Sequence, residues 1–524
     1  MKRVDAEVCI VGSGISGALC ALRLAGSFQH IVILEKGVRT LGSSHAFQRS
    51  IAEHRDPSRS YPETPLSRNY FTNKRDHVPY EYMLGAVGGA TNAWWGSAGR
   101  LLPSDFKMKS LFGVGLDWPI EYAELEPYLC EAEQEMSIAG EIRDSPWPQS
   151  QPYPQPAHPL SPHERLIADR IEAYGLKVVT MPTARLSRPA GARPACSGEG
   201  ACGACAHESK YTCSNTHIPL IDRTPSIELR PGIRANLLKA SGDRVEAVLA
   251  QDENGDEVIV TAKLVVLAAN AFENVRILLN SSVRDENFCA NRHTGRNFHE
   301  HPKLEVVGQS PLDLRRALGP TPMAGVSYTL ADGPFRSQRA GVQVETYDPP
   351  PGAGDLAAPA YQKLGDFFGH RLFGRARGDW KGRFWLNCQI DQLPDPDSVV
   401  RLSATRRDPF GWPILEIDVR CWTDYVARGA DHWQRIAEKI VKDLRATAQF
   451  YHHLAWVHHE GTHLMGTSPE NSVIDANLRY HQYKNLFLLG QGVMPTGGVV
   501  SPTVTLAGLS LRCAQFIKAQ RASF

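Results

Sequence analysis

DAEVCIVGSGISGALCALRLAGSFQHIVILEKG, residues 5–37, is the stretch that decides the fold of this chain. An apolar run ends at a glycine-rich turn, a helix-forming stretch follows, and a second apolar run ends on Glu35. Gly12 permits the tight turn, Gly14 lets the backbone approach a pyrophosphate, and Gly17 lets helix and strand pack closely. An acid about 20 residues after the turn suits a ribose diol. The stretch therefore predicts a β-α-β unit that binds a dinucleotide.

The composition of the whole chain is that of a globular protein. Its 524 residues exceed one ordinary core, so two or more domains are expected. The net charge is +1 and no basic run is interleaved with aromatics, so we expect no nucleic-acid partner. No apolar stretch approaches the ~20 residues of a membrane span, and the first strand begins too close to Met1 for a signal peptide, so we expect a cytoplasmic protein.

Three later stretches show how the chain is organised. Small residues dominate 85–106, which suits backbone laid against a flat ligand. Residues 263–281, KLVVLAANAFENVRILLNS, predict a buried strand and a helix that resume the parallel pattern. Residues 305 to 450 alternate like strands of an antiparallel sheet. The expected fold class is α/β, with a Rossmann-like domain and a second α+β domain on an antiparallel sheet.

Several segments of the chain, in the order in which they occur, resemble the glucose-methanol-choline oxidoreductase family of FAD-dependent enzymes that oxidise alcohols and sugars. The resemblance spans nearly the entire chain, and its last block is most similar to the pyranose-oxidase-like branch and to bacterial sugar and polyol dehydrogenases. It is carried by the glycine motif with Glu35, GGATNAWWG at 88–96, LAANAFENVRILL at 267–279, GRNFHEHP at 295–302, QLPDPDSVVRLS at 392–403, HHEGTHLMGT at 458–467 and GVVSPTVTLAGLSLR at 498–512.

The resemblance implies a discontinuous FAD-binding domain. Its first part covers 1–304 and includes a Cys-rich loop at 193–217, the substrate domain covers 305–454, and 455–524 complete the FAD domain with the catalytic motif. Ala93 stands where some relatives tether the flavin through a histidine, so the FAD is expected to be non-covalent. The implied FAD-binding residues are Gly12, Gly14, Gly17, Glu35, Gly88, Gly89, Asn92, Ala93, Trp94, Gly490, Gln491, Pro502 and Thr503.

Alcohol oxidation by a flavin needs a base for the hydroxyl proton, and a neutral imidazole suits that role near pH 7. The family's base lies three residues before the glycine of a Gly-Thr pair, which gives His458 here, with His459 as the reserve candidate. The second catalytic position holds Ser501, where relatives usually carry Asn or His. A serine hydroxyl can donate or accept a hydrogen bond but cannot act as a second imidazole base. A catalytically impaired flavoprotein is therefore one alternative.

A second alternative is a zinc metallohydrolase, because His459, Glu460 and His463 spell H-E-x-x-H. That chemistry requires the two histidines one helical turn apart on one face. The interior Gly-Thr pair and Gly466 disfavour a helix by about 1 kcal/mol per glycine. The sequence therefore argues against this alternative.

Four cysteines, Cys196, Cys202, Cys205 and Cys213, fall within 18 residues. Three interpretations stay open: an iron-sulfur cluster, zinc or free thiols, and redox-active disulfides. The segment resembles the loop of FAD-dependent sugar dehydrogenases that carry an iron-sulfur cluster, with one residue of difference in the middle spacing. His207 and His217 are expected to be solvated loop residues.

The function expected from these observations is FAD-dependent oxidation of a hydroxyl to a carbonyl by hydride transfer to the flavin. The substrate is a small sugar, cyclitol or related polyol, which the sequence does not identify further. The electron acceptor is also unidentified, a redox protein being one candidate.

Overall fold

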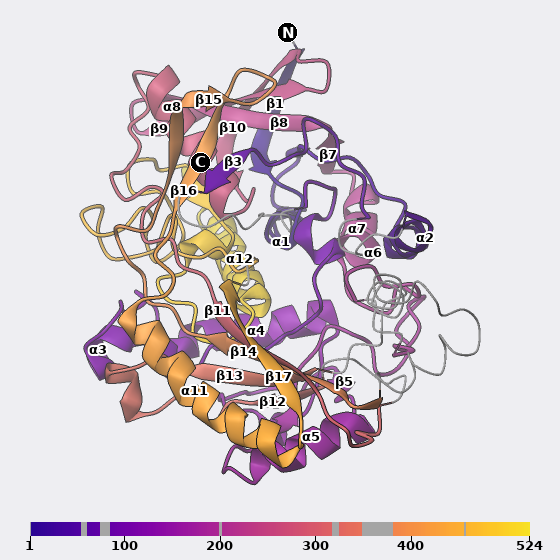
Figure 1. The fold of residues 1–524 in the computed structure, drawn as a ribbon. Coiled ribbons are helices and arrows are strands. Elements are labelled where there is room, and N and C mark those ends of the chain that lie inside the picture. The colour runs from indigo at the N-terminus through magenta and orange to yellow at the C-terminus, as the bar shows by residue number, and fades with distance from the viewer. Residues whose placement is uncertain are drawn as a thin grey trace.

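The computed structural model describes residues 2–53, 60–73, 84–198, 202–316, 324–347, 381–454 and 457–524. Two large sheets lie at opposite ends of the molecule, with helices α4 (Tyr122–Met136) and α12 (Thr503–Ala519) between them (Figure 1). The α/β fold class with a second antiparallel sheet is therefore confirmed.

The first sheet has the strand order β7-β2-β1-β10-β9-β8, and β18 pairs with β10. All pairings among β7, β2, β1, β10 and β18 are parallel, whereas β8 and β9 form an antiparallel extension. Every residue of β2 is buried, as expected for a parallel strand covered on both faces. The strands are β1 (Lys2–Val11), β2 (Ile31–Glu35), β7 (Ile227–Pro231), β8 (Ile233–Ser241), β9 (Arg244–Asp252), β10 (Glu257–Leu267) and β18 (Leu486–Leu488).

Helices connect and cover these strands. The helix after the glycine-rich turn is α1 (Ile15–Leu24), and it packs beside α12. The helix after β10 is α8 (Ala271–Arg284), as the sequence predicts. Shorter helices and 3-10 turns are distributed along the rest of the described chain. The helices are α2 (Ser43–Glu53), α3 (Met108–Phe112), α6 (Cys213–Thr216) and α7 (Ile218–Asp222), and the 3-10 turns are η2 (Gly89–Asn92), η3 (Pro103–Phe106), η4 (Ile142–Asp144), η5 (Pro334–Ser337), η6 (Gln491–Val493) and η7 (Arg521–Ser523).

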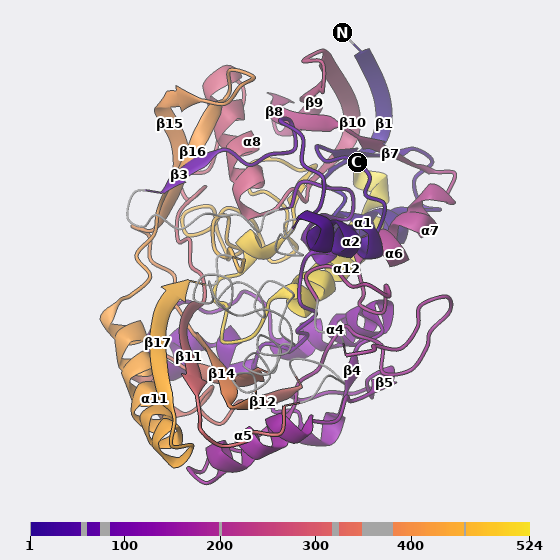
Figure 2. The same cartoon turned by 45° about the vertical axis from the view of Figure 1, so that its right-hand side comes forward.

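The second sheet is antiparallel throughout, in the order β17-β11-β14-β13-β12-β6. Helices α5 (Pro162–Glu172) and α11 (Asp424–Asp443) cover one of its faces (Figure 2). Alternate residues such as Leu304, Val344 and Leu386 form an apolar core with Trp433 of α11. The strands are β6 (Val179–Thr180), β11 (Pro302–Gln309), β12 (Gly325–Ser327), β13 (Val342–Tyr347), β14 (Arg383–Ile390) and β17 (Thr447–Leu454).

Two smaller sheets complete the fold. One has the order β15-β16-β3 and shares an apolar cluster with α8. The other pairs β4 with β5. Their strands are β3 (Phe71–Asn73), β4 (Ala139–Gly140), β5 (Gln155–Pro156), β15 (Val399–Arg407) and β16 (Pro413–Asp418).

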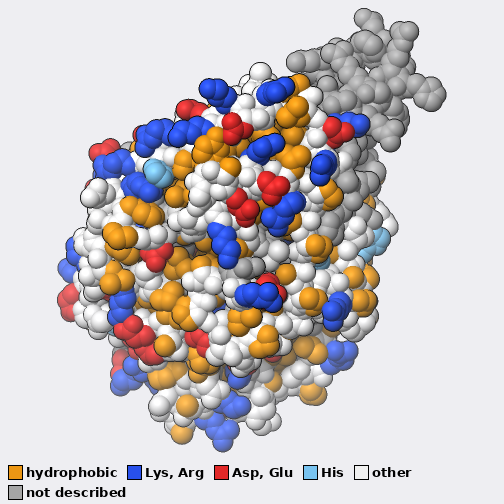
Figure 3. Space-filling model, turned by 90° about the horizontal axis from the view of Figure 1, so that it is seen from below, with side chains coloured by type: hydrophobic (Ala, Val, Ile, Leu, Met, Phe, Trp, Pro, Cys, Tyr) orange, Lys and Arg blue, Asp and Glu red, His pale blue; other side chains and the backbone are white. Residues whose placement is uncertain are grey.

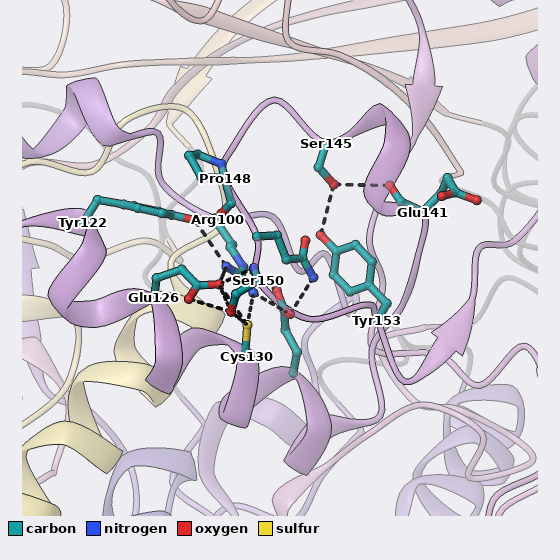
Figure 4. Close-up of polar contacts among 11 residues, drawn as sticks. Arg100, Tyr122, Glu126, Cys130, Glu141, Ser145, Pro148, Ser150 and Tyr153 are labelled. Atoms are coloured by element: carbon teal, nitrogen blue, oxygen red, sulfur yellow. Dashed lines mark hydrogen bonds and ion pairs between the residues drawn. The ribbon is translucent and has the colours of Figure 1, made fainter.

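A buried arginine links the segment after the 88–96 turn to α4 (Figure 4). Arg100 is fully buried and donates to Glu133 through Nε (2.6 Å to Oε1) and Nη2 (2.7 Å to Oε2). Its Nη1 donates to the Tyr122 hydroxyl at 3.2 Å and to Glu126 at 3.3 Å. A bidentate pair is stronger and more directional than a single ionic contact, so it holds this segment in one orientation on α4.

The surface on the α11 side carries basic and acidic side chains that are interspersed with hydrophobic ones (Figure 3). No helix within the described ranges combines the length and the apolar character that crossing a bilayer requires.

Candidate active site

Four turns meet at the carboxyl ends of the parallel strands. Gly12 follows β1, Glu35 ends β2, Asn270 follows β10 and Gly490 follows β18. Gly12 has φ +105°, and a Cβ on it would lie 2.4 Å from the Ala268 carbonyl oxygen, so no other residue fits there. In open α/β sheets ligands bind in the crevice outside these strand ends. The structure thus brings together the glycines and the acid that the sequence singles out.

The carboxylate of Glu35 is buried and engaged with the glycine-rich turn. Its Oε2 accepts from the Ser13 backbone N–H (3.0 Å) and hydroxyl (2.8 Å), and its Oε1 accepts from the Gly37 N–H (2.7 Å). These bonds hold the turn after β1 against the end of β2. A carboxylate has about four lone-pair sites, so capacity remains for a ribose hydroxyl.

The residues of this crevice fit the pyrophosphate of a dinucleotide. Helix α1 begins after its N-cap Gly14 and α12 begins after its N-cap Pro502, and neither helix has a side-chain cap on its first N–H groups. Uncapped helix N-termini are anion sites. The Gly88 N–H donates to the Ser13 hydroxyl (3.1 Å), and a Cβ on Gly89 would lie 2.9 Å from the Gly14 Cα, so the two glycine-rich turns touch.

Protein contacts already hold the side chains of the 88–96 turn. The Asn92 amide donates to the Val87 carbonyl (2.9 Å), and the Trp94 indole donates to the Tyr211 carbonyl (2.9 Å). Lys210, which the sequence reasoning missed, is buried and donates to the carbonyls of Asn92 (2.9 Å) and Trp94 (2.6 Å). Burial lowers the pKa of Lys210 to about 8. The turn therefore has a fixed backbone to present to a ligand.

Ala93 lies in a small buried apolar cluster that includes Tyr61. Gln491 begins η6 directly after Gly490, and Thr503 is the first residue of α12. Gln491 therefore lies just after β18, and Thr503 lies at the N-terminus of α12.

His458 pairs with a second histidine that the sequence reasoning missed. Its Nδ1 lies 2.8 Å from Nδ1 of His301, and the His301 Nε2 lies 3.0 Å from the carbonyl oxygen of Gly498. His301 immediately precedes β11 and His458 follows β17, and these neighbouring strands pair Pro302 with Leu454. Two segments 157 residues apart in sequence thus present their imidazoles to each other.

Burial keeps both rings of this pair uncharged. It lowers the pKa of His301 to about 3. The pKa of His458 is held well below its ordinary value, mainly by burial and also by repulsion from His301, Lys303 and His459. A neutral imidazole is the form that accepts a proton, so His458 is in the protonation state that a general base needs.

Two glutamates lie behind the pair. The Glu300 carboxylate accepts from the backbone N–H groups of Val457 (3.0 Å) and His458. Glu460 is fully buried near the His299 ring, and burial together with neighbouring carboxylates raises its pKa well above the ordinary range. Glu300 thus positions the backbone of His458, whereas burial favours the protonated form of Glu460.

His459 and His463 do not form the zinc motif. Residues 459–463 are not helical. The His459 ring packs 4.6 Å from Phe272, centroid to centroid, whereas His463 lies within 3.3 Å of the Asn274 amide and 2.9 Å of the Thr462 hydroxyl. In the ranges that the structure describes, no group of three or more His, Cys, Asp or Glu side chains could hold a metal ion. The reserve candidate His459 therefore faces an aromatic cluster rather than His301.

The cysteine loop does not assemble a metal site in the described part of the chain. Cys196, Cys202, Cys205 and Cys213 are all thiols rather than halves of disulfides. Cys213 is fully buried and its pKa is raised to about 12 by burial, while the Cys202 sulfur accepts from Arg185 at 3.3 Å. The described residues therefore give no support to an iron-sulfur cluster or a zinc site at these cysteines.

His217 was expected in solvent, and this expectation is wrong. Its ring is fully buried, 2.8 Å from the Tyr211 hydroxyl and 3.0 Å from Glu135. Two polar partners offset the cost of burying the imidazole.

Ser501 follows the loop that carries Gly498. The Gln389 amide of β14 donates to the Val499 carbonyl (2.8 Å), which joins this loop to the second sheet. Because the Gly498 carbonyl contacts His301, Ser501 lies three residues from an atom of the histidine pair's hydrogen-bond network. Ser501 directly precedes Pro502, the N-cap residue of α12.

Comparisons with known proteins identify relatives of this chain. Two GMC oxidoreductase family models match residues 177–303 and 394–510. The fructose dehydrogenase large subunit of Gluconobacter japonicus is 29% identical over 98% of both chains. The 6'''-hydroxyparomomycin C oxidase of Streptomyces lividus is 27% identical over 99% of this chain and 92% of its own.

The fold is also that of a solved formate oxidase structure, with a TM-score of 0.69 over 100% of both chains at 14% identity. The dinucleotide crevice, the family matches and the full-length relatives lead to one conclusion. The chain belongs to the GMC oxidoreductase family and is an FAD-dependent alcohol or sugar oxidoreductase.

Proposed function

We propose that this enzyme oxidises a hydroxyl group of a sugar, cyclitol or related polyol to a carbonyl, with His458 as the base. The observation that carries the proposal is a buried polar face of the second sheet, which ends at the His301–His458 pair. When bound, FAD supplies the hydride acceptor for the carbinol carbon. His458 takes the hydroxyl proton, and its lowered pKa keeps the ring ready to do so at neutral pH.

The polar face lies opposite the apolar face that packs on α5 and α11. Along β11, β13 and β14, alternate residues on this side are polar although most are buried, and register places them beside one another. Tyr347 and Trp385 add two aromatic rings, with centroids 4.7 Å apart. The polar residues are Lys303, Glu305, Gln343, Glu345, Asn387 and Gln389.

The hydrogen bonds on this face leave acceptors unused. The Glu345 carboxylate accepts from the amides of Gln343 (2.6 Å) and Asn387 (2.5 Å). The other amide atoms, Gln343 Oε1 and Asn387 Oδ1, are buried and have no hydrogen-bond partner among the described residues. An unpaired buried acceptor costs about 1–3 kcal/mol, and a hydroxyl donor would remove this cost. A substrate with several hydroxyls supplies such donors.

The relatives support the same substrate class, because their names refer to fructose and to an aminoglycoside. Those names include both dehydrogenases and oxidases. We propose that the enzyme is a dehydrogenase with non-covalent FAD. The proposed domain division is 1–304 and 455–524 for the FAD domain and 305–454 for the substrate domain. Strand β6, from the first segment, joins the second sheet. A redox protein as the electron acceptor and a cytoplasmic location are further predictions.

Anaerobic stopped-flow reduction of the bound flavin by a panel of sugars, cyclitols and polyols tests the function. We expect one of these classes to bleach the flavin, and His458→Ala to slow that step about 10²–10⁴-fold while FAD stays bound. His459→Ala is the matched control and should retain the rate. A base assignment to His459 would follow from the reverse result. Reoxidation by a dye but not by oxygen identifies a dehydrogenase.

The polar face is tested by Gln343→Leu and Asn387→Leu, which remove the unused acceptors. We expect KM for a polyol to rise at least tenfold, since each lost bond is worth about 1.4 kcal/mol or more. Asn236→Leu is a control, because Asn236 is a buried amide that bonds Gln251 in the first sheet. An unchanged KM in both sheet variants would contradict the proposed face.

A further inference from the structure

The carbonyl of Gly498 determines which nitrogen of His301 carries a proton. The carbonyl oxygen can only accept, so the 3.0 Å contact requires an N–H on the His301 Nε2. Only glycine fits at this position, because Gly498 has φ +59° and a Cβ there would lie 2.6 Å from the Asp105 Oδ2. Gln389 holds the next carbonyl, that of Val499.

A neutral His301 has no second N–H. The ring is fully buried, and the nearby His299 and Lys303 also disfavour a second proton. Its Nδ1 is therefore an acceptor. The 2.8 Å contact between the two Nδ1 atoms needs one donor, and only His458 can supply it.

We propose that His301 is a positioning residue that fixes the tautomer of His458. The Nδ1–H of His458 donates to the Nδ1 of His301, which leaves the His458 Nε2 unprotonated. This nitrogen takes the substrate hydroxyl proton, and the ring then carries N–H groups on both nitrogens. The inference rests on the proposed role of His458 as the base and adds which atom of the ring acts.

The groups around the pair favour this arrangement. Lys303, His459 and His301 act on the His458 ring as positive or potentially positive neighbours, so they oppose a resting imidazolium. Glu300 accepts from the His458 backbone N–H and lies 3.3 Å, through Oε2, from the His301 backbone nitrogen. The chain from Gly498 to His301 to His458 therefore joins the loop before Ser501 to the base.

The first test is a comparison of His301→Phe with His301→Gln. Phenylalanine keeps the ring but offers no acceptor, so flavin reduction should slow about 10²-fold or more, because the base would no longer be held in the reactive tautomer. The amide oxygen that His301→Gln introduces can accept from the His458 Nδ1, so this variant should regain at least tenfold of the loss.

The matched control for the first test is His163→Phe. His163 is equally buried and its Nδ1 contacts the Leu314 carbonyl at 3.0 Å, but it lies on α5, which covers the opposite, apolar face of the second sheet. Its flavin reduction rate should equal that of the wild type. A wild-type rate in His301→Phe, or no recovery in His301→Gln relative to His301→Phe, overturns the inference.

The second test reads the tautomer directly, without turnover. In holoenzyme labelled with ¹⁵N-histidine, the His458 signals are assigned by their loss in His458→Ala. We expect a protonated Nδ1 and an unprotonated Nε2 in the wild type, and a changed pattern in His301→Phe. A protonated Nε2 in the resting enzyme overturns the inference even if His458 is the base. Flavin reduction that survives in His458→Ala overturns the proposed function instead.

Discussion

Ser501 has a hydroxyl at the position where relatives in the family usually carry the amide of Asn or the imidazole of His. The hydroxyl limits what this side chain can do in catalysis. A hydroxyl can hydrogen-bond the substrate oxygen but takes no net proton at pH 7. We expect Ser501→Ala to slow flavin reduction about tenfold, well below the effect of His458→Ala. Single-turnover reduction of both variants checks the order. A loss as large as that of His458→Ala would give Ser501 an essential role.

His463 is a buried neutral imidazole, and its pKa of about 3 results from burial. The unfolded side chain titrates near 6.5, so unfolding at about pH 5.5 takes up about one proton at this site. His463 therefore contributes stability above about pH 6.5 that is lost as the pH falls towards 3. When the protein is unfolded in urea at about pH 5.5 in a pH-stat, the His463→Gln variant should take up about one proton per molecule fewer than the wild type. Equal consumption by the two proteins would contradict this pKa.

At the scale of elements, α4 depends on the Arg100–Glu133 pair for its attachment to the segment behind the 88–96 turn. Both side chains are buried, so Arg100→Ala leaves an uncompensated carboxylate, which costs about 3–5 kcal/mol. We expect a clear fall in the thermal midpoint of the holoenzyme. The double variant Arg100→Met with Glu133→Leu should recover part of the loss. A midpoint equal to that of the wild type in Arg100→Ala would show that the pair is not stabilising.

At the scale of the whole molecule, FAD held by the proposed residues would join the turns of the first sheet to the loops before α12. Ala93 offers no side chain for a covalent tether at the expected position, so we expect FAD to copurify and to be released by acid. Added FAD should raise the thermal midpoint of the apoprotein, since ligand at about 100 Kd stabilises by about 2.7 kcal/mol. Flavin that remains in the acid precipitate would show a covalent link.

Local spacing in the sequence determined much of this architecture. The β-α-β unit with Gly12 and Glu35, the strand and helix over 263–281 and the antiparallel sheet were all predicted, because periodicity and glycine positions report on neighbours in the chain. The resemblance to the family, rather than spacing alone, singled out His458, which the structure pairs with a second imidazole.

Only the tertiary structure decided which distant residues meet. His301 faces His458 across 157 residues, Lys210 reaches Asn92 across 118, and the polar residues of three strands gather on one buried face. The four cysteines that are close in sequence do not converge within the described ranges, and His217 lies buried rather than solvated. Such contacts depend on how strands register and pack, and short-range patterns carry no information about them.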